Sequence, residues 1–250
     1  MHRRGEPTGR APTDGVATDP AIELVGVGKA YRRGAQLVHA LEGVDLTIRT
    51  GEMVAVTGPS GAGKSTLLNL LGALDVPTSG TVRMGGVDLG RMDDRAATLH
   101  RHRRVGFVFQ FFNLLPTLRA WENVAVPALL GGGRLRPARA RAVALLERVG
   151  LGDRVEHRPG ELSGGQLQRV ALARALFCEP AVILADEPTG NLDSASGKEV
   201  LDLLRSVCQV EGGTVVMVTH DAAATSVADR TVRLRDGHVD ASAETAGAPG

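Results

Sequence analysis

Short, continuous apolar runs recur along the chain and have the length of buried strands. They occupy residues 53–57, 105–109, 181–185 and 214–218. Runs of this kind are typical of parallel strands that are covered on both faces. Residues 194–207, between the last two runs, fit the crossover helix that parallel neighbours need. The pattern therefore predicts an α/β fold with a mostly parallel core sheet.

Other strand-like segments have a looser pattern. Residues 22–27 and 44–48 alternate between apolar and polar positions, as half-buried strands do. Residues 81–89 and 231–239 each contain two short strand-like segments around a glycine-containing turn, which predicts a hairpin. The sequence thus predicts an antiparallel β layer in addition to the core sheet.

The pattern changes to helical spacing between about residues 111 and 165. Residues 121–130 and 137–149 repeat apolar positions with a helical period, and three glycines join them. We therefore expect an inserted α-helical subdomain within one domain that spans residues 21–240.

Composition narrows the possible classes of protein. The 250 residues carry a formal net charge of +1, which gives no basic field for non-specific nucleic-acid binding, and we expect no nucleic-acid partner. No uncharged apolar run approaches the ~20 residues that span a bilayer. Cys178 and Cys208 lack metal or redox spacing and fit packing residues in a reducing cytosol. Residues 1–20 lack the apolar region of a signal peptide, so we expect a disordered N-terminal tail, and 241–250 a flexible C-terminal tail.

A glycine-rich turn connects the strand at 53–57 to a helix start. Its glycines let backbone N–H groups surround a polyphosphate, and the helix N-terminus adds positive partial charge. Lys64 can reach the β- and γ-phosphates, and the Ser65 hydroxyl can bind Mg²⁺. The alternative is a chance glycine-rich turn. The predicted ATP ligands of this loop are Gly58, Pro59, Ser60, Gly61, Ala62, Gly63, Lys64, Ser65 and Thr66.

Polar side chains follow the ends of three other predicted strands. Asp186 and Glu187 end one strand, and Gln110 and His220 come directly after two others. Because ligands bind beyond the carboxyl ends of parallel strands, these groups are expected to share one crevice. Asp186, Gln110 and Ser65 are predicted to bind Mg²⁺, with Lys64, Gln110, Glu187 and His220 as catalytic residues and Glu187 as the general base. The alternative for Asp186 and Glu187 is an acidic pair that caps a turn.

A second anion-binding signal is the run Leu162-Ser163-Gly164-Gly165-Gln166 before a predicted helix. Ser163 fits the helix cap, and the glycines expose several N–H donors. Alone, the run fits an ordinary capped helix. With one nucleotide loop per chain, however, two phosphate-facing helix termini predict a two-fold dimer in which a second copy closes each site.

The ordered set of motifs resembles the nucleotide-binding subunit of ABC (ATP-binding cassette) transporters over about residues 22–239. The resemblance implies the P-loop NTPase fold of ABC ATPases and ATP hydrolysis. It also implies that Tyr31 stacks on adenine and that Ser163 and Gly165 contact the γ-phosphate bound to a second copy. Residues 191–193, ending at Asp193, would communicate between the two sites.

Residues 111–118 and 189–194 look like the group of lipoprotein-releasing, macrolide-export and cell-division ATPases. This implies a separate membrane permease that acts in export or mechanotransmission, and a location at the cytoplasmic face of the membrane. Four apolar residues after Gln110 predict either a docking groove for the permease or subdomain core: Phe111, Phe112, Leu114 and Leu115. The alternatives are a soluble ABC ATPase of translation or DNA maintenance, and a degenerate scaffold.

Overall fold

The computed structural model describes residues 20–34, 36–240 and 245–246. The tails expected at 1–20 and 241–250 lie outside the described residues, except for Pro20 and residues 245–246. Thr245 and Ala246 form a short strand that pairs with residues 230–231.

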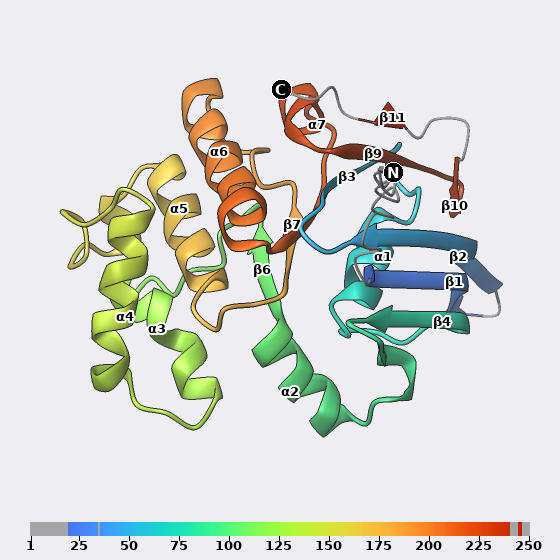
Figure 1. Cartoon of the computed structure of the whole chain (residues 1–250), viewed down its shortest axis with the longest axis horizontal. Helices are drawn as coiled ribbons and strands as arrows, with labels where there is room; N and C mark the ends of the chain where they lie inside the picture. The colour runs from blue at the N-terminus through green and yellow to red at the C-terminus, as the bar shows by residue number, and fades with distance from the viewer. Residues whose placement is uncertain (1–19, 35, 241–244, 247–250) are drawn as a thin grey trace, which may run out of the picture.

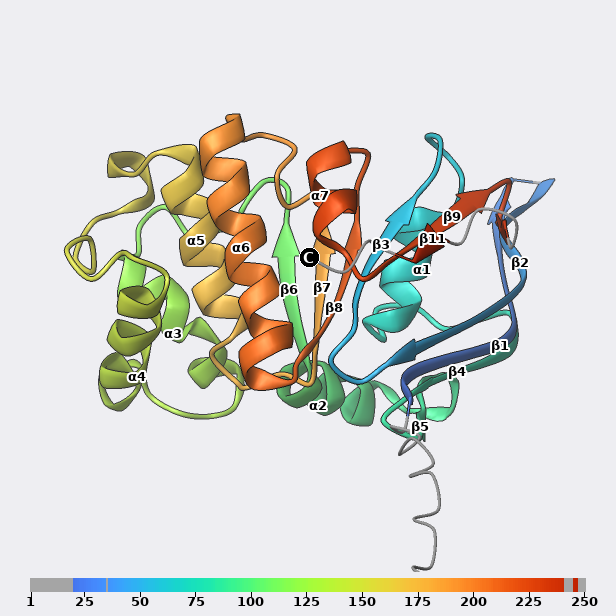
Figure 2. The ribbon, with the colours of Figure 1, turned by 45° about the horizontal axis from the view of Figure 1, so that its top comes forward.

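The core sheet is formed by the apolar runs that the sequence singled out. Strands β3, β8, β7 and β6 lie side by side and run parallel, and β9 continues the sheet beside β3 (Figures 1 and 2). Almost every side chain of the four strands is fully buried, which explains their continuous hydrophobicity. The bounds are β3 (Met53–Thr57), β6 (Val105–Phe109), β7 (Val182–Asp186), β8 (Thr214–Val218), β9 (Arg230–Arg235), β10 (His238–Val239) and β11 (Thr245–Ala246).

The predicted antiparallel layer is present as a second sheet with the order β2-β1-β4-β5. Its first two strands are each 14 residues long and extend beyond the alternating segments that the sequence revealed. Helix α1 (Lys64–Leu71) packs its apolar face into the core that it shares with both sheets (Figure 2). The bounds are β1 (Pro20–Arg33), β2 (Gln36–Arg49), β4 (Ser79–Met84) and β5 (Val87–Asp88).

Helices α3, α4 and α5 form a separate lobe around their own apolar cluster, which includes Val124, Leu146 and Val170. Helix α5 also joins α6 against the core sheet through residues such as Leu172 and Leu201. Helix α5 therefore belongs to the lobe and to the sheet domain at once. The helices are α2 (Asp94–Arg104), α3 (Ala120–Leu130), α4 (Leu135–Arg148), α5 (Gly164–Ala175), α6 (Ser194–Glu211) and α7 (Ala222–Val227), with 3-10 turns at Leu89–Arg91 and Pro159–Glu161.

The parallel strands end in register. Phe109 pairs with Asp186, Asp186 with Val218, and Val218 with Val56. The residues that follow these four strands therefore emerge along one edge of the sheet, in the spatial order of β3, β8, β7 and β6.

Candidate functional site

The loop after β3 has a backbone path that only glycine allows at two positions. A Cβ atom on Gly58 would lie 2.1 Å from the carbonyl oxygen of Leu234, and one on Gly63 would lie 2.3 Å from that of Ala40. Gly63 also has a φ of +100°. The glycines of the predicted phosphate loop thus let it run against neighbouring backbone.

Helix α1 leaves this loop without a side-chain cap, and its first turn carries no acidic residue. Its terminal N–H groups and partial positive charge are therefore directed toward the loop. Lys64 folds over the same loop, where its Nζ atom donates to the carbonyl oxygens of Gly58, at 2.8 Å, and Pro59, at 2.9 Å. The arrangement fits a polyphosphate.

Asp186 ends β7 beside this positive region. Burial raises the pKa of its carboxyl group, the negative charge of Glu187 raises it further, and the ammonium of Lys64 lowers it. A half-desolvated carboxylate at this place is suited to a divalent cation. No group of three or more His, Cys, Asp or Glu side chains that could hold a metal occurs within the described ranges. A cation here would thus depend on Asp186, neutral oxygens such as those of Ser65 and Gln110, and phosphate.

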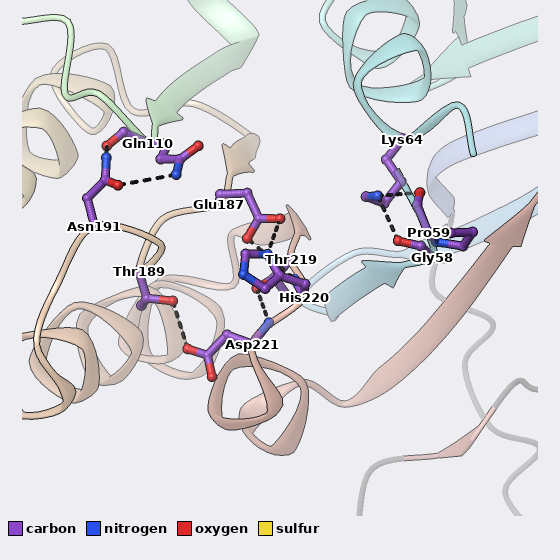
Figure 3. A network of polar contacts seen from close by, with 10 residues as sticks. All are labelled: Gly58, Pro59, Lys64, Gln110, Glu187, Thr189, Asn191, Thr219, His220 and Asp221. Carbon is purple, nitrogen blue, oxygen red and sulfur yellow. Dashed lines mark hydrogen bonds and ion pairs between the residues drawn. The ribbon is translucent and has the colours of Figure 1, made fainter. Parts of the chain in front are cut away.

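Glu187 follows Asp186 in a left-handed conformation with a φ of 47°. Its backbone N–H donates to the carbonyl oxygen of Val218 at 2.9 Å, and its carboxylate accepts from the backbone N–H of His220 at 3.3 Å. The Nδ1 atom of His220 lies 2.8 Å from Oε1 of Glu187 (Figure 3). The hydrogen bond and charge of Glu187 raise the pKa of His220, whose side chain is 74% exposed. The structure thus brings these two predicted residues into direct contact.

Gln110 follows β6 and is held by a residue that sequence reasoning had not paired with it. Its Nε2 atom donates to Oδ1 of Asn191 at 3.3 Å, and Nδ2 of Asn191 donates to the carbonyl oxygen of Gln110 at 3.0 Å (Figure 3). No local pattern signals this contact, because the two residues are 81 positions apart.

The second predicted anion-binding run forms the N-terminus of α5. Ser163 and Gln166 form a capping box, in which the N–H of Ser163 donates to Oε1 of Gln166 at 2.9 Å and the N–H of Gln166 donates to Oγ of Ser163 at 3.3 Å. Gly165 packs against Ser196 of α6, where a Cβ atom would lie 2.7 Å from the Cβ of Ser196. Helices α5 and α1 lie on opposite sides of the central strands, as Figures 1 and 2 show. The two helix N-termini, one capped by Ser163 and the other following the phosphate loop, therefore belong to helices on different faces of the core sheet.

Tyr31 lies at the far end of β1, where its hydroxyl donates to Oδ2 of Asp75 at 2.9 Å. The Nζ atom of Lys29 lies 5.0 Å from the centre of its ring and donates to Oδ1 of Asp75. Burial raises the pKa of Tyr31 and so does Asp75, whereas the hydroxyl of Thr66 lowers it. Thr66, at the end of the predicted phosphate loop, is thus close enough to the Tyr31 hydroxyl to affect it, and Tyr31 as a whole is 38% exposed.

Asp193 caps helix α6 of its own chain. Its carboxylate caps α6 by accepting from the N–H groups of Ala195, at 3.1 Å, and Ser196, at 3.0 Å, and from the Ser196 hydroxyl at 2.8 Å. These hydrogen bonds lower the pKa of Asp193. The carboxylate thus fixes the start of α6.

The loop after Gln110 borders an apolar groove between the helical lobe and the sheet domain, with a volume of about 550 Å³. The groove is lined by residues such as Phe107, Phe109, Val126 and Leu130. Phe111 is 74% exposed nearby in sequence. Two other apolar residues that were expected to form a docking groove are less exposed than Phe111. Leu114 packs against the core of the lobe, and Phe112 is half-buried.

The chain is similar to known proteins over most of its length. The family described as "ABC transporter" matches residues 41–190. An uncharacterized ABC transporter ATP-binding protein of Thermotoga maritima is 51% identical over 88% of this chain and 93% of its own length. The lipoprotein-releasing system ATP-binding protein LolD of Geobacter metallireducens is 50% identical over 87% of this chain and 97% of its own length.

The macrolide export ATP-binding/permease protein MacB of Brucella melitensis is 50% identical over 90% of this chain, which spans only 34% of that protein. Among solved structures, the dimeric ATP-binding cassette MJ0796, bound to ADP and Pi in a post-hydrolysis state, is 42% identical with a TM-score of 0.82. The match covers 92% of this chain and all of that one. No helix of the described ranges is long and apolar enough to cross a membrane.

Proposed function

This chain belongs to the ABC transporter family of ATP-binding, ATP-hydrolysing subunits, and from this premise we propose which of its residues perform the reaction and what they drive. The observation that supports the assignment is the register of the core sheet, because the ends of β3, β8, β7 and β6 bring Lys64, His220, Glu187 and Gln110 to one edge. ATP binds along this edge.

The phosphate loop holds ATP from one side. Backbone N–H groups of the loop and of the first turn of α1 donate to phosphate oxygens, and Lys64 exchanges its two carbonyl partners for phosphate oxygens. Tyr31 stacks on the adenine, which its partial exposure and the nearness of its hydroxyl to Thr66 support.

Ser65, Gln110 and Asp186 hold Mg²⁺ together with phosphate oxygens. Burial and the charge of Glu187 raise the pKa of Asp186, and a cation bound to the carboxylate would offset both effects. When bound, Mg²⁺ neutralises negative charge on the phosphate oxygens.

Glu187 is the general base for hydrolysis. It orients a water molecule and takes its proton as the water oxygen attacks the γ-phosphorus, while the bond to the β–γ bridging oxygen breaks and ADP leaves. His220 holds the carboxylate of Glu187 through the 2.8 Å contact and donates to the γ-phosphate.

A second copy of the chain completes each site. Helix α5 lies across the core sheet from α1 of the same chain, and the N–H groups of Gly164 and Gly165 at its N-terminus, which the capping box does not use, are suited to the γ-phosphate bound to a partner. Two ATP molecules then join two chains, as in a two-fold arrangement with two composite sites. Asp193 acts indirectly, by fixing the loop at residues 190–193 against α6.

The driven component is a separate membrane permease. It docks on the loop at residues 111–118 and in the apolar groove beside it. Asn113 of this loop lines the groove, so a bound permease influences the conformation of the loop that follows Gln110. The names of the relatives favour a complex that exports or mechanically acts on extracytoplasmic cargo over a soluble ATPase of translation or DNA maintenance. The chain then works at the cytoplasmic face of the membrane.

Replacement of Glu187 by Gln tests the composite site. Glu187→Gln removes the base but keeps the volume, so turnover is lost and an ATP-bound dimer accumulates. Size-exclusion chromatography with light scattering at saturating ATP and Mg²⁺ measures the dimer, and Lys64→Ala in the same background is the control that stays monomeric. A monomeric Glu187→Gln variant would contradict the proposal.

Replacement of Phe111 by Asp tests permease docking. The side chain is 74% exposed, so its loss leaves the fold and the basal ATPase activity intact. Co-purification with a permease co-expressed with this chain should fall, whereas Val210→Asp, at a residue 82% exposed on α6, should not affect it. Equal recovery of the permease with Phe111→Asp would refute this docking site.

A further inference from the structure

Arg174, in the last turn of α5, grips the loop that follows Gln110. Its Nη1 atom donates to the carbonyl oxygen of Asn113 at 2.5 Å, and its Nη2 atom donates to that of Phe112 at 2.7 Å. Two separate nitrogens of the planar fork thus each bind one peptide group, whereas the single nitrogen of the shorter lysine side chain would have to serve both, as that of Lys64 does in the phosphate loop.

The backbone that Arg174 binds has an unusual conformation. Phe112 and Asn113 have φ angles of 58° and 51°, so two successive non-glycine residues adopt the left-handed conformation. This conformation is strained for residues with a side chain, and the turn persists only where its surroundings fix it. Arg174 is a main part of these surroundings.

The positive charge of Arg174 is directed to these two carbonyl groups and not to an acidic side chain. Burial lowers its pKa, and within the described residues it forms no salt bridge with a carboxylate. Its hydrogen bonds to the two carbonyl groups are charge-assisted and therefore stronger than bonds between neutral groups. The position of the loop and the position of Arg174 are accordingly interdependent.

Helix α5 transmits this position to its other end. Arg174 and Ser163 are separated by 11 residues, or about 16 Å of continuous helix. Between them, Nε2 of the fully buried Gln168 donates to the carbonyl oxygen of Pro188 at 2.8 Å, directly after Glu187. One rigid helix thus contacts the loop of Gln110, the turn of Glu187 and the run at Ser163.

We propose that Arg174 is a positioning residue that couples the conformation of the loop after Gln110 to the orientation of α5, and hence to the presentation of Ser163–Gln166 to a second copy. This inference rests on the proposed function. Arg174 and Asn113 both line the apolar groove, so a molecule that occupies the groove acts on the same contact. Without Arg174, ATP still changes the conformation of the loop, but the orientation of α5 no longer changes with it.

The test uses the ATP-trapped Glu187→Gln protein and adds Arg174→Lys, which keeps the charge but loses the fork. The ATP concentration needed for half-maximal dimerisation should rise about tenfold, the equivalent of one charge-assisted hydrogen bond. ATP affinity of the monomer, measured by calorimetry at protein concentrations too low for dimerisation, should not change. A contact that only stabilised the fold would lower the melting temperature without changing the ATP dependence of dimerisation.

The matched control is Arg169→Lys on the same helix. Arg169 also donates to a carbonyl group, that of Val149 at 3.2 Å, but it has no bond to the Gln110 loop. Its dimerisation should resemble that of the parent. If Arg174→Lys also dimerises like the parent, the coupling is refuted. If the Glu187→Gln parent does not dimerise, the proposed function itself has failed.

Hydrogen exchange on the parent gives a readout that does not require the variant to fold. Amides at residues 110–115 and 163–168 should become protected with the same ATP midpoint in the Glu187→Gln protein. In Arg174→Lys, the first segment should respond at a lower ATP concentration than the second. Different midpoints in the parent would overturn the inference.

Discussion

Asn191 binds Gln110 at both its side chain and its main chain, through hydrogen bonds of 3.3 and 3.0 Å. Gln110 is the residue that we propose for the Mg²⁺ site, and Asn191 lies in the loop between Glu187 and α6. The contact therefore connects the two turns that leave neighbouring strands β6 and β7 at the candidate site.

Loss of this contact should slow catalysis more than it weakens ATP binding. In Asn191→Ala, the amide of Gln110 is no longer held in place, and we expect kcat to fall about fivefold, the kinetic equivalent of one neutral hydrogen bond. The KM for ATP should stay within about twofold, because Asn191 is not part of the phosphate loop. Asn191→Asp keeps the acceptor for Nε2 of Gln110 but turns the donor into an oxygen that faces the Gln110 carbonyl oxygen, so it should not restore kcat. An unchanged kcat in Asn191→Ala would exclude a positioning role.

The raised pKa of His220 should depend on Glu187. The charged imidazole is favoured by its hydrogen bond with Glu187, so its pKa lies above the ordinary value of 6.5 in the folded protein. The pair thus contributes most to stability below pH 6.5, and this contribution is lost as the pH rises through the pKa of the folded state. NMR titration of the imidazole C–H signals without nucleotide or metal should show a lower pKa in Glu187→Gln. Identical titration curves would contradict the contact.

At position 187, a glycine variant should be more stable than an alanine variant, which reverses their usual order of stability. With a φ of 47°, alanine retains the left-handed strain and glycine relieves it. Both substitutions remove the same carboxylate and the same bond to His220. We expect Glu187→Gly to exceed Glu187→Ala in free energy of unfolding by about 1 kcal/mol, measured by urea denaturation. Greater stability of the alanine variant would indicate a different backbone conformation.

Removal of Asp75 should destabilise the fold more than removal of Lys29, its partner in an ion pair. Lys29 is nearly fully buried, so Asp75→Ala leaves a desolvated charge and should cost about 2–4 kcal/mol of unfolding free energy. Lys29→Met leaves the more exposed Asp75 and should cost less. Burial raises the pKa of Asp75, but the bonds from Lys29 and Tyr31 outweigh it, so the pKa lies below its ordinary value. The gain in stability is present above pH 4 and lost as the pH falls through this lowered pKa; equal costs of the two variants at pH 7 would argue against the asymmetry.

The sequence was sufficient to predict the core of the fold, because buried parallel strands carry a continuous apolar signal. The four runs at 53–57, 105–109, 181–185 and 214–218 match strands to within a residue, and their parallel order follows from the crossover rule. The ABC ATPase fold is confirmed by a TM-score of 0.82 with a solved cassette. The outer halves of β1 and β2 were not predicted, since their side chains are largely exposed and alternate weakly.

Most of the predicted site residues were proposed from their place after a strand or before a helix, and Tyr31 and Asp193 were proposed from the family resemblance. The residues that hold the site residues in place were not predicted. Asn191, Arg174 and Asp75 act through partners 81, 61 and 46 positions away, and such distant polar contacts leave no local pattern. Helix α7 was also missed, because its six residues are small or polar and only Ala224 is buried.

The contact of Lys64 with the carbonyl oxygens of Gly58 and Pro59 has a consequence for nucleotide exchange. The ammonium is already solvated by its own loop, so a triphosphate must displace two internal acceptors before it gains the cation. The loop is therefore a competitor of its own ligand. When a nucleotide departs, the same two carbonyl groups are available to the ammonium again, which offsets part of the interaction that Lys64 loses on release.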